Sequence, residues 1–321
     1  MKPLSRRDFL SESSLAVATA VAARLGLGTG RGLLAARTSE PHRDFPTQPR
    51  DRLAVASWPF RAFIESPTNH DRDPKKPGMD LKQFPAMVVE RFNLHNIEPL
   101  GDHFASTKPS YLSEFREAIA KAGSHAVDLP CGGHHSFYDP DAAKRRQSVE
   151  DAKKWVDVAV AIGSPSIRAH VAGVHGVKPD VDRAGQSLRQ LADYGAEKNV
   201  IVNLENDDLL TEDAFFIVQV IEKVNHPWLH ALPDFCNSMM TGNADFNYRA
   251  VTAMFKHAYN IAHMKDEEGD DGKWYTIDVA RTFAIAKDAG YRGYFSMEWE
   301  GNGEPYAGTQ RLIDESLKNL T

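Results

Sequence analysis

Several features are scarce in this 321-residue sequence, and each scarcity excludes a class of protein. Only two cysteines are present, Cys131 and Cys236, so a disulfide framework is excluded, although a single bridge in an oxidising compartment stays open. Positive charge is not in excess, because 38 Lys and Arg stand against 44 Asp and Glu and the formal net charge is −6. A nucleic-acid-binding surface needs a basic stripe, so we expect no nucleic-acid partner.

Long hydrophobic runs are also missing. The N-terminal apolar stretch SLAVATAVAARLGLGTG is interrupted by Arg24 and is too short and too rich in Gly and Ala for a membrane span. It follows SRRDFL at residues 5–10, a twin-arginine pattern of the kind that an export receptor reads. We therefore expect a signal peptide over residues 1–36, cleaved near Ala36, with the twin-arginine export machinery as a partner and a periplasmic or extracellular location. A disordered basic N-terminus is the alternative.

The rest of the chain repeats one pattern. Residues 37–50 are polar and contain proline, as linkers do, and from 51 to 321 a short apolar run precedes a long amphipathic run about every 30 residues. Such apolar runs are typical of buried parallel strands. They lie at 52–60, 94–101, 124–133, 165–171, 200–206, 229–235, 260–266 and 294–301. Eight units predict an α/β fold, a single (β/α)8 TIM barrel over 51–321. A doubly wound open sheet is the other option, but no glycine-rich phosphate fingerprint follows the first run.

Four consecutive runs in the second half each end on a side chain that can bind a metal. These are Glu205, Asp234, His263 and Glu298, spaced by 29, 29 and 35 residues, which is one barrel unit each. The carboxyl ends of barrel strands share one face, so we expect the four side chains to lie together. Three carboxylates and one imidazole suit one divalent ion such as Mn²⁺, Mg²⁺, Co²⁺ or Zn²⁺. Taken singly, each residue could equally be a helix cap or an ion-pair partner.

The motifs NLEN, LPDF, AHMKD and FSMEWEG, which contain these four residues, resemble the sugar phosphate isomerase/epimerase-like barrels. This group is also called the xylose isomerase-like or AP endonuclease family 2 superfamily, and the resemblance covers roughly residues 50–318. It implies that Glu205, Asp234, His263 and Glu298 bind one divalent metal ion. It also implies that Glu205 and Glu298 are the catalytic acid/base pair.

Two departures from the ketose 3-epimerases of that family concern the substrate. Asn237 stands where those enzymes carry a substrate-contacting histidine, and Lys265 and Asp266 stand where an arginine shortly follows the histidine ligand. The metal site therefore carries over from the resemblance, whereas the epimerase substrate does not. The multi-metal endonuclease branch is disfavoured as well, because the acidic balance and the export signal make DNA a poor substrate.

Six residues near the ends of the runs are candidates for substrate binding, and four of them also have a structural alternative. Glu98 could instead form an ion pair, His170 could be a buried structural histidine, and His134 could lie in an exposed loop. Lys265 has the same parity as His263 and points to the same side, one layer higher, where we expect it to contact substrate or a carboxylate. Trp58 could form an apolar wall for a sugar ring or pack in the core. Asn237 completes the set by its position in the resemblance.

These expectations combine into a metal-dependent isomerase or epimerase that abstracts a proton next to a carbonyl. Export favours an unphosphorylated sugar or keto-sugar, since sugar phosphates are mainly cytoplasmic. The same residues could run a lyase- or hydratase-type β-elimination on a 3-keto-glycoside. A non-catalytic, exported sugar-binding barrel is a further alternative. The sequence leaves the sugar, the metal and the oligomeric state open.

Overall fold

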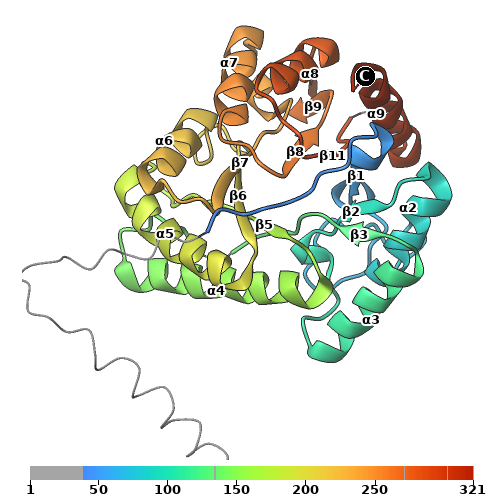
Figure 1. Ribbon diagram of the computed structural model, residues 1–321, viewed down its shortest axis with the longest axis horizontal. Coiled ribbons are helices and arrows are strands. Elements are labelled where there is room, and N and C mark those ends of the chain that lie inside the picture. Colours follow the sequence, from blue (N-terminus) through green and yellow to red (C-terminus); the bar gives the residue numbers. More distant parts are fainter. Residues whose placement is uncertain (1–38, 134, 271, 302, 321) are drawn as a thin grey trace, which may run out of the picture. The chain divides into compact units, whose positions relative to one another are not determined.

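The computed structural model describes residues 39–133, 135–270, 272–301 and 303–320. Within these ranges, parallel strands alternate with helices, and the strands form a barrel inside a ring of helices (Figure 1). The predicted (β/α)8 barrel is confirmed, and the open doubly wound sheet is wrong. The expected signal peptide at 1–36 and the candidate His134 lie outside the described residues.

Each of the eight predicted apolar runs contains a strand of the barrel. The strands are β1 (Leu53–Ala56), β2 (Asn96–Glu98), β3 (His125–Ala126) with β4 (Pro130–Cys131), β5 (Ser166–Ala169), β6 (Ile201–Glu205), β7 (Leu229–Leu232), β8 (Ile261–Met264) and β11 (Tyr294–Met297). They pair in parallel in two groups, β3-β2-β1-β11-β8 and β4-β5-β6-β7. A bridge between Asp234 and His263 joins β7 to β8, and the chain itself joins β3 to β4, so the ring closes.

One helix separates each barrel strand from the next, and the last helix follows the final strand. They are α2 (Phe84–Phe92), α3 (Pro109–Lys121), α4 (Ala142–Ile162), α5 (Val181–Lys198), α6 (Ala214–Val224), α7 (Ala244–Phe255), α8 (Val279–Asp288) and α9 (Pro305–Asn319). Several of these helices have a short polar side chain at the N-cap position. Asp141, Asp180, Asp213 and Asp278 each accept a hydrogen bond from a backbone N–H of the first turn. Gly163 ends α4 with a φ of +83°, where glycine carries no steric penalty.

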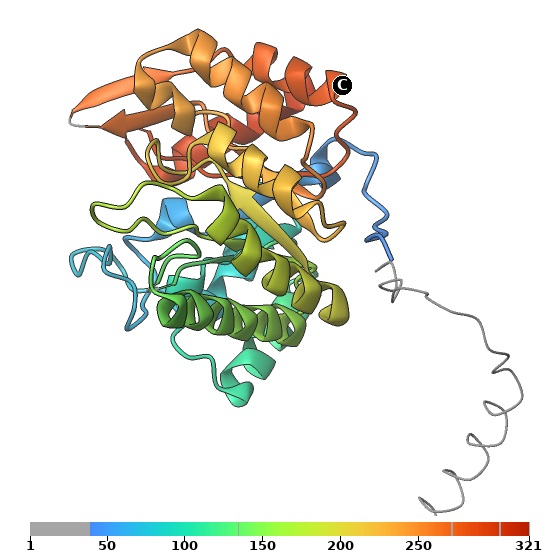
Figure 2. The same cartoon turned by 90° about the vertical axis from the view of Figure 1, so that its left-hand side faces the viewer.

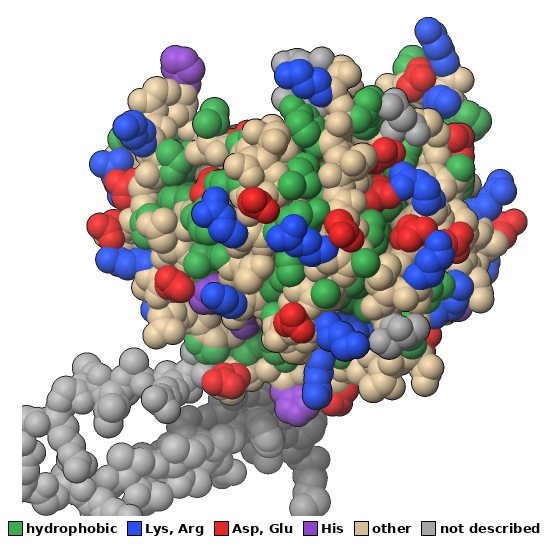
Figure 3. Space-filling view, turned by 90° about the horizontal axis from the view of Figure 1, so that it is seen from above, with side chains coloured by type: hydrophobic (Ala, Val, Ile, Leu, Met, Phe, Trp, Pro, Cys, Tyr) green, Lys and Arg blue, Asp and Glu red, His purple; other side chains and the backbone are tan. Residues whose placement is uncertain are grey.

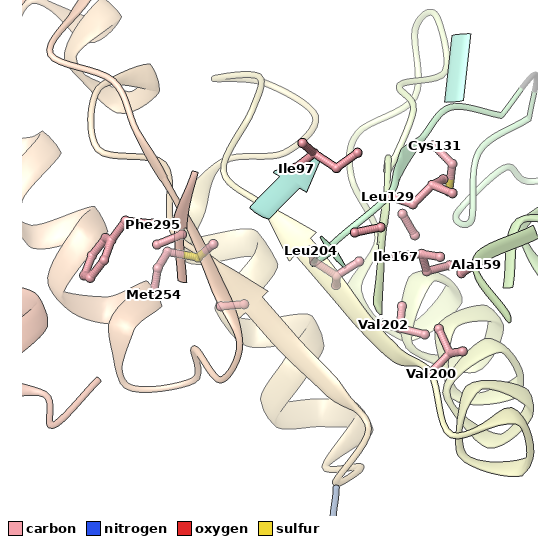
Figure 4. Close-up of a cluster of buried hydrophobic side chains, with 14 of the residues drawn as sticks. Ile97, Leu129, Cys131, Ala159, Ile167, Val200, Val202, Leu204, Met254 and Phe295 are labelled. Atoms are coloured by element: carbon pink, nitrogen blue, oxygen red, sulfur yellow. The ribbon is translucent and has the colours of Figure 1, made fainter. Parts of the chain in front are cut away.

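Alternation along the strands separates the apolar core from the site. Ile97, Ile167, Val202, Leu204 and Phe295 belong to the large cluster of buried apolar residues, to which helical residues such as Ala159 and Met254 contribute (Figure 4). The strand residues next to these apolar ones point into the barrel, because successive side chains of a strand face opposite sides of the sheet. The polar strand residues of the predicted site therefore occupy the barrel interior.

The barrel interior contains a buried polar layer below the predicted ligands. The Asp128 carboxylate accepts hydrogen bonds from Ser166 Oγ and from Asn203 Nδ2, the latter at 3.0 Å, and Asn260 Nδ2 donates to Ser166 Oγ at 2.7 Å. All four side chains are buried, and Asn203 precedes Glu205 by two residues on β6. Burial, assisted by the charge of Glu98, raises the pKa of Asp128 to about 8.

The segment expected as a linker packs against the end of the barrel at which the strands begin. Trp228 Nε1 donates to Ser39 O at 2.6 Å, and Tyr259 Oη donates to Pro41 O at 2.8 Å. The Phe45 ring lies edge-on to the rings of Tyr259 and Tyr294, with centroids 5.5 and 5.9 Å away. We call residues 39–50 the strap. In Figure 2 it lies on the side opposite the loops that follow the strands.

Two segments on the site side differ from the sequence expectation. The strand predicted over 52–60 ends at Ala56, because Pro59 lies in a short 3-10 helix, Trp58–Phe60, so Trp58 and Phe60 are not on the strand. After β8 the chain forms an unexpected antiparallel hairpin, β9 (Glu267–Asp270) and β10 (Lys273–Thr276), which extends beyond the barrel (Figure 2). Both segments border the face at which the strands end.

The surface and the cysteines agree with the scarcities in the sequence. On the face shown in Figure 3, basic and acidic side chains are intermingled, without a basic stripe. Among the described residues, none of the helices has the length and apolarity needed to cross a membrane. Cys131 and Cys236 are both buried free thiols, so the bridge that the sequence left open is not formed.

Candidate functional site

The structure brings the four predicted ligand residues together at the ends of β6, β7, β8 and β11. One ligand-type atom from each of Glu205, Asp234, His263 and Glu298 lies within 4.8 Å of the others, and all four side chains are buried. Glu205 and His263 lie on strands, whereas Asp234 and Glu298 lie two residues and one residue beyond the ends of theirs. The strand ends therefore deliver the four side chains to one point, as the spacing predicted.

His263 lies at the centre of this cluster. Its Nδ1 is 2.7 Å from Glu205 Oε1 and 3.2 Å from Glu298 Oε2, and its Nε2 is 2.9 Å from Glu98 Oε1. Although burial alone would lower the pKa of His263, the charges of Glu298, Glu98 and Glu205 raise it well above its ordinary value. Glu98 was predicted to contact substrate, but its side chain is fully buried behind the imidazole.

The charges in the cluster are not balanced among the described residues. Burial alone would raise the pKa of Glu298, but His263 and Lys265 outweigh it and hold that pKa at about 2. Asp234 differs, because burial and the neighbouring Glu205 and Glu298 raise its pKa to about 8 despite Lys265. Its Oδ1 accepts from the backbone N–H groups of Cys236 and Asn237, at 2.8 and 2.6 Å. Its Oδ2 is buried, accepts no hydrogen bond from a described residue and lies 3.9 Å from Lys265 Nζ.

An orphaned, buried carboxylate oxygen beside two further carboxylates and an imidazole is what a divalent cation would satisfy. A cation would also offset the repulsion that raises the pKa of Asp234. The residues present therefore fit a divalent ion, and the observation is independent of the resemblance noted above.

Lys265 connects three segments around the cluster. Its Nζ donates to Glu268 Oε2 of the hairpin at 2.8 Å, to Glu300 Oε2 at 3.0 Å and to Asn237 Oδ1 at 3.0 Å, and lies 3.3 Å from Glu298 Oε2. An ammonium has three protons to donate, so these acceptors already saturate it. Asn237 is also buried, and its Oδ1 accepts from Lys265, whereas its Nδ2 has no hydrogen-bond partner among the described residues. Both candidates for substrate binding thus hold the rim together in this structure.

Trp58 and Arg61 form the side of the rim contributed by the loop after β1. The Arg61 guanidinium lies 4.2 Å from the centroid of the Trp58 ring, and Arg61 Nη2 is 3.4 Å from Glu300 Oε1. One face of the indole is therefore covered by a cation, which leaves at most the other face for a sugar. Glu300 connects Arg61 to Lys265 and so joins this loop to the hairpin.

A second group of charged side chains adjoins Glu205 on its β5 side. Arg168 contacts both Glu205 Oε2 and Asp207 Oδ2, the latter at 3.2 Å. His170, a predicted site residue two positions further along, has its Nδ1 2.7 Å from Glu212 Oε2 and 3.6 Å from Asp207 Oδ2. Glu212 is completely buried, and one of its oxygens accepts from the backbone N–H of Val171.

Sequence reasoning missed Arg168, Glu212, Glu268 and Arg61. Arg168 could have been found, because it shares parity with His170 and so faces the same side of the strand. Glu212 and Arg61 lie in connections between elements, and Glu268 lies on β9 of the hairpin that the sequence did not predict, so none of them has a periodic signal. The structure alone shows which strand residues they reach.

Comparison with known proteins identifies the family of this chain. The family model described as "Xylose isomerase-like TIM barrel" matches residues 88–320. This chain belongs to that family. No curated protein matches the sequence.

Solved structures of low sequence identity share the fold of this xylose isomerase-like barrel. D-allulose 3-epimerase from Methylomonas sp. is 15% identical over 86% of this chain and 98% of its own, with a TM-score of 0.63. A xylose isomerase-like TIM barrel protein from Mycobacterium smegmatis in complex with magnesium is 16% identical over 84% and 98%, with a TM-score of 0.61. The 3-keto-D-glucoside 4-epimerase from E. coli is 14% identical over 83% and 98%, with a TM-score of 0.60.

Proposed function

We propose that this protein is a divalent-metal-dependent sugar isomerase or epimerase that acts on an unphosphorylated sugar or keto-sugar. The observation that supports it most directly is the buried group of Glu205, Asp234, His263 and Glu298, whose ligand atoms lie within 4.8 Å of one another. Epimerases of keto-sugars and a magnesium complex among the structures of the same fold are consistent with it.

The residues that would hold the ion are these four, a set of three carboxylates and one imidazole nitrogen. Such a set suits Mn²⁺, Mg²⁺, Co²⁺ or Zn²⁺. When bound, a divalent ion polarises a substrate carbonyl and stabilises the negative charge that develops next to it. The Nδ1 of His263 faces the proposed ligands Glu205 and Glu298, whereas Nε2 faces Glu98, so Nδ1 is the nitrogen that would serve as the ligand.

Glu205 and Glu298 approach His263 Nδ1 from β6 and β11, two strands separated around the barrel by β7 and β8. In the proposed reaction one glutamate removes the proton from the carbon next to the carbonyl. The other returns a proton, either to the opposite face of that carbon or to the neighbouring carbon. Each glutamate contacts its own cation, Arg168 for Glu205 and Lys265 for Glu298. These contacts hold both carboxylates in place.

Glu98 and Lys265 support the pair without touching the reacting carbon. Glu98 accepts from His263 Nε2, which fixes the ring orientation and leaves Nδ1 toward the other ligands, the usual role of a carboxylate behind a metal-binding histidine. Lys265 holds the hairpin and Glu300 at the rim. Export by the twin-arginine route would add that the protein meets its substrate outside the cytoplasm.

Metal analysis combined with proton exchange tests the proposal. Protein supplemented with Mn²⁺, Mg²⁺, Co²⁺ or Zn²⁺ and then desalted is expected to retain one ion per chain. In D₂O, keto-sugars such as D-allulose and 3-keto-glucosides should gain deuterium next to the carbonyl, as followed by proton NMR. Glu205→Gln and Glu298→Gln should each slow this exchange by at least about 10²-fold.

Glu222→Gln serves as the matched control, because Glu222 pairs with His257 at the strap end of the barrel and should not affect exchange. A wild-type protein that binds no divalent ion after supplementation would refute the proposal. Sugar binding with no exchange and no turnover would instead favour a non-catalytic sugar-binding barrel.

A further inference from the structure

His170 and Glu212 form an ion pair whose two members are very differently exposed. His170 Nδ1 lies 2.7 Å from Glu212 Oε2, and Glu212 has no exposed surface, whereas about a third of the His170 side chain (32%) is exposed. The other Glu212 oxygen accepts from Val171 N–H, which ties the carboxylate to the end of β5. The imidazole is thus held through one nitrogen by a fixed carboxylate while part of the ring faces solvent.

The surroundings favour the charged form of this imidazole. Asp207 Oδ2 lies 3.6 Å from His170 Nδ1, and Arg168 pairs with Asp207 rather than with Glu212. Burial alone would lower the pKa of His170, and Arg168 adds to that, but Glu212 and Asp207 outweigh both and raise it to about 10. Among the described residues, Cys131 and His135 line a small cavity together with His170. At neutral pH the ring therefore carries two N–H groups, and the one at Nδ1 lies in the ion pair with Glu212 Oε2 at 2.7 Å.

Arg168 shows where this ring lies relative to the proposed reaction. The guanidinium contacts Glu205 and Asp207, so His170 is one residue removed from the proposed base on the β5 side. Epimerisation needs a proton acceptor and a proton donor for carbon, and the two glutamates supply both. His170 is a third acid, held cationic one residue away from Glu205, and such a group suits the transfer of a proton to an oxygen of the substrate.

We propose that His170 is a catalytic acid that protonates a departing oxygen of the substrate, and that Glu212 is its positioning residue. This rests on the proton abstraction of the proposed function, adds an elimination to it, and narrows the substrate class to keto-sugars with a leaving group beta to the carbonyl, such as 3-keto-glycosides.

The step balances without a further reactant. Glu205 takes the proton from the carbon next to the carbonyl, and that C–H electron pair becomes the new C=C bond. The bond between the neighbouring carbon and the glycosidic oxygen breaks, and its electrons stay on oxygen. His170 gives that oxygen a proton and becomes neutral. The products are an unsaturated ketone and the free alcohol, and solvent then returns the two side chains to their starting protonation states.

The first experiment measures the dyad itself and needs no turnover. In full-length protein labelled on histidine, the His170 NMR signals are assigned by their loss in His170→Gln. The wild-type imidazole should titrate at least two pH units above the ordinary histidine value of about 6.5. Glu212→Gln, which keeps an acceptor for Val171 N–H, should bring the titration back toward that value. An unshifted wild-type titration, or one that Glu212→Gln leaves unchanged, would overturn the proposal.

The second experiment separates oxygen protonation from carbon deprotonation. The probes are methyl 3-keto-β-D-glucoside, whose alcohol needs an acid to leave, and the p-nitrophenyl analogue, whose phenol does not. His170→Gln should slow release of methanol by about 10²–10⁴-fold, slow release of nitrophenol by less than about 10-fold, and leave deuterium exchange within a few-fold of wild type. Glu212→Gln should show the same selectivity to a smaller extent.

His257→Gln is the control, since His257 also pairs with a carboxylate, Glu222 at 3.3 Å, but at the strap end of the barrel. Equal losses on both glucosides in His170→Gln would indicate a merely structural histidine and contradict the proposal. Deuterium exchange without release of either alcohol overturns the role of His170 while the proposed function stands. Absence of both exchange and release in the wild type refutes the proposed function itself, and the NMR titration then still reports on the dyad.

Discussion

Replacing Asp128 by Asn should stabilise the protein, and the gain should grow as the pH rises. Asp128 is completely buried below the ligand cluster, and its Oδ1 accepts from Ser166 and Asn203. Its Oδ2 has no hydrogen-bond partner among the described residues. Asn keeps an acceptor for both donors, and its amide group takes the place of the oxygen that is unsatisfied. The substitution therefore removes an ionisable group without removing a known hydrogen bond.

The magnitude follows from the difference between the folded and unfolded pKa. Burial raises the pKa of Asp128 to about 8 from 3.8, so the folded protein binds a proton that the unfolded chain releases between these values. Because the folded state then binds more protons, the free energy of unfolding falls as the pH rises through this window. The slope is about 1.4 kcal/mol per pH unit, so from pH 5 to pH 8 the wild type should lose about 4 kcal/mol through this residue.

Urea unfolding of both proteins at pH 5, 6, 7 and 8, in the presence of a chelator, measures this loss. The difference in unfolding free energy between Asp128→Asn and wild type should increase by about 4 kcal/mol across the range, since groups that do not interact with Asp128 contribute equally to both proteins. Asp288→Asn, at an exposed position near the end of α8, is the control and should show a constant difference. Parallel stability curves for Asp128→Asn and wild type would refute the reasoning.

Two further predictions concern Glu98 and the strap. Glu98→Gln should weaken binding of the added divalent ion about 10–100-fold in competition titrations, because the carboxylate behind His263 Nε2 no longer orients the ring; unchanged affinity would contradict that role. Phe45→Ala should lower the unfolding free energy by about 1–3 kcal/mol in urea, since it removes two edge-to-face contacts of a half-buried ring. It should leave metal affinity unchanged, because the strap lies at the other end of the barrel, and a loss of metal binding would show that the strap affects the site.

Local patterns were sufficient for the fold and for the position of the ligand cluster. Short apolar runs between long amphipathic ones can bury both faces of the strands only in a parallel sheet covered by helices. Parallel strands end at the same edge, so the residues at the ends of four runs, from Glu205 to Glu298, had to meet once the barrel closed. One difference from the predicted strands has a local cause as well. Pro59 lies in a short 3-10 helix, so the first strand ends early and Trp58 is not part of it.

The sequence by itself thus determined the barrel, the order of its strands and the four side chains that converge at their ends. Only the tertiary structure decided what surrounds them. Glu98 lies behind His263 rather than over a substrate, Arg168 holds Glu205, and Glu212 reaches His170 from a loop. Strand periodicity encodes the direction of a side chain but not the stagger between strands or the path of a loop, and those two decide which distant residues touch. The packed strap and the hairpin pinned by Lys265 depend on such contacts too, so no local pattern predicted them.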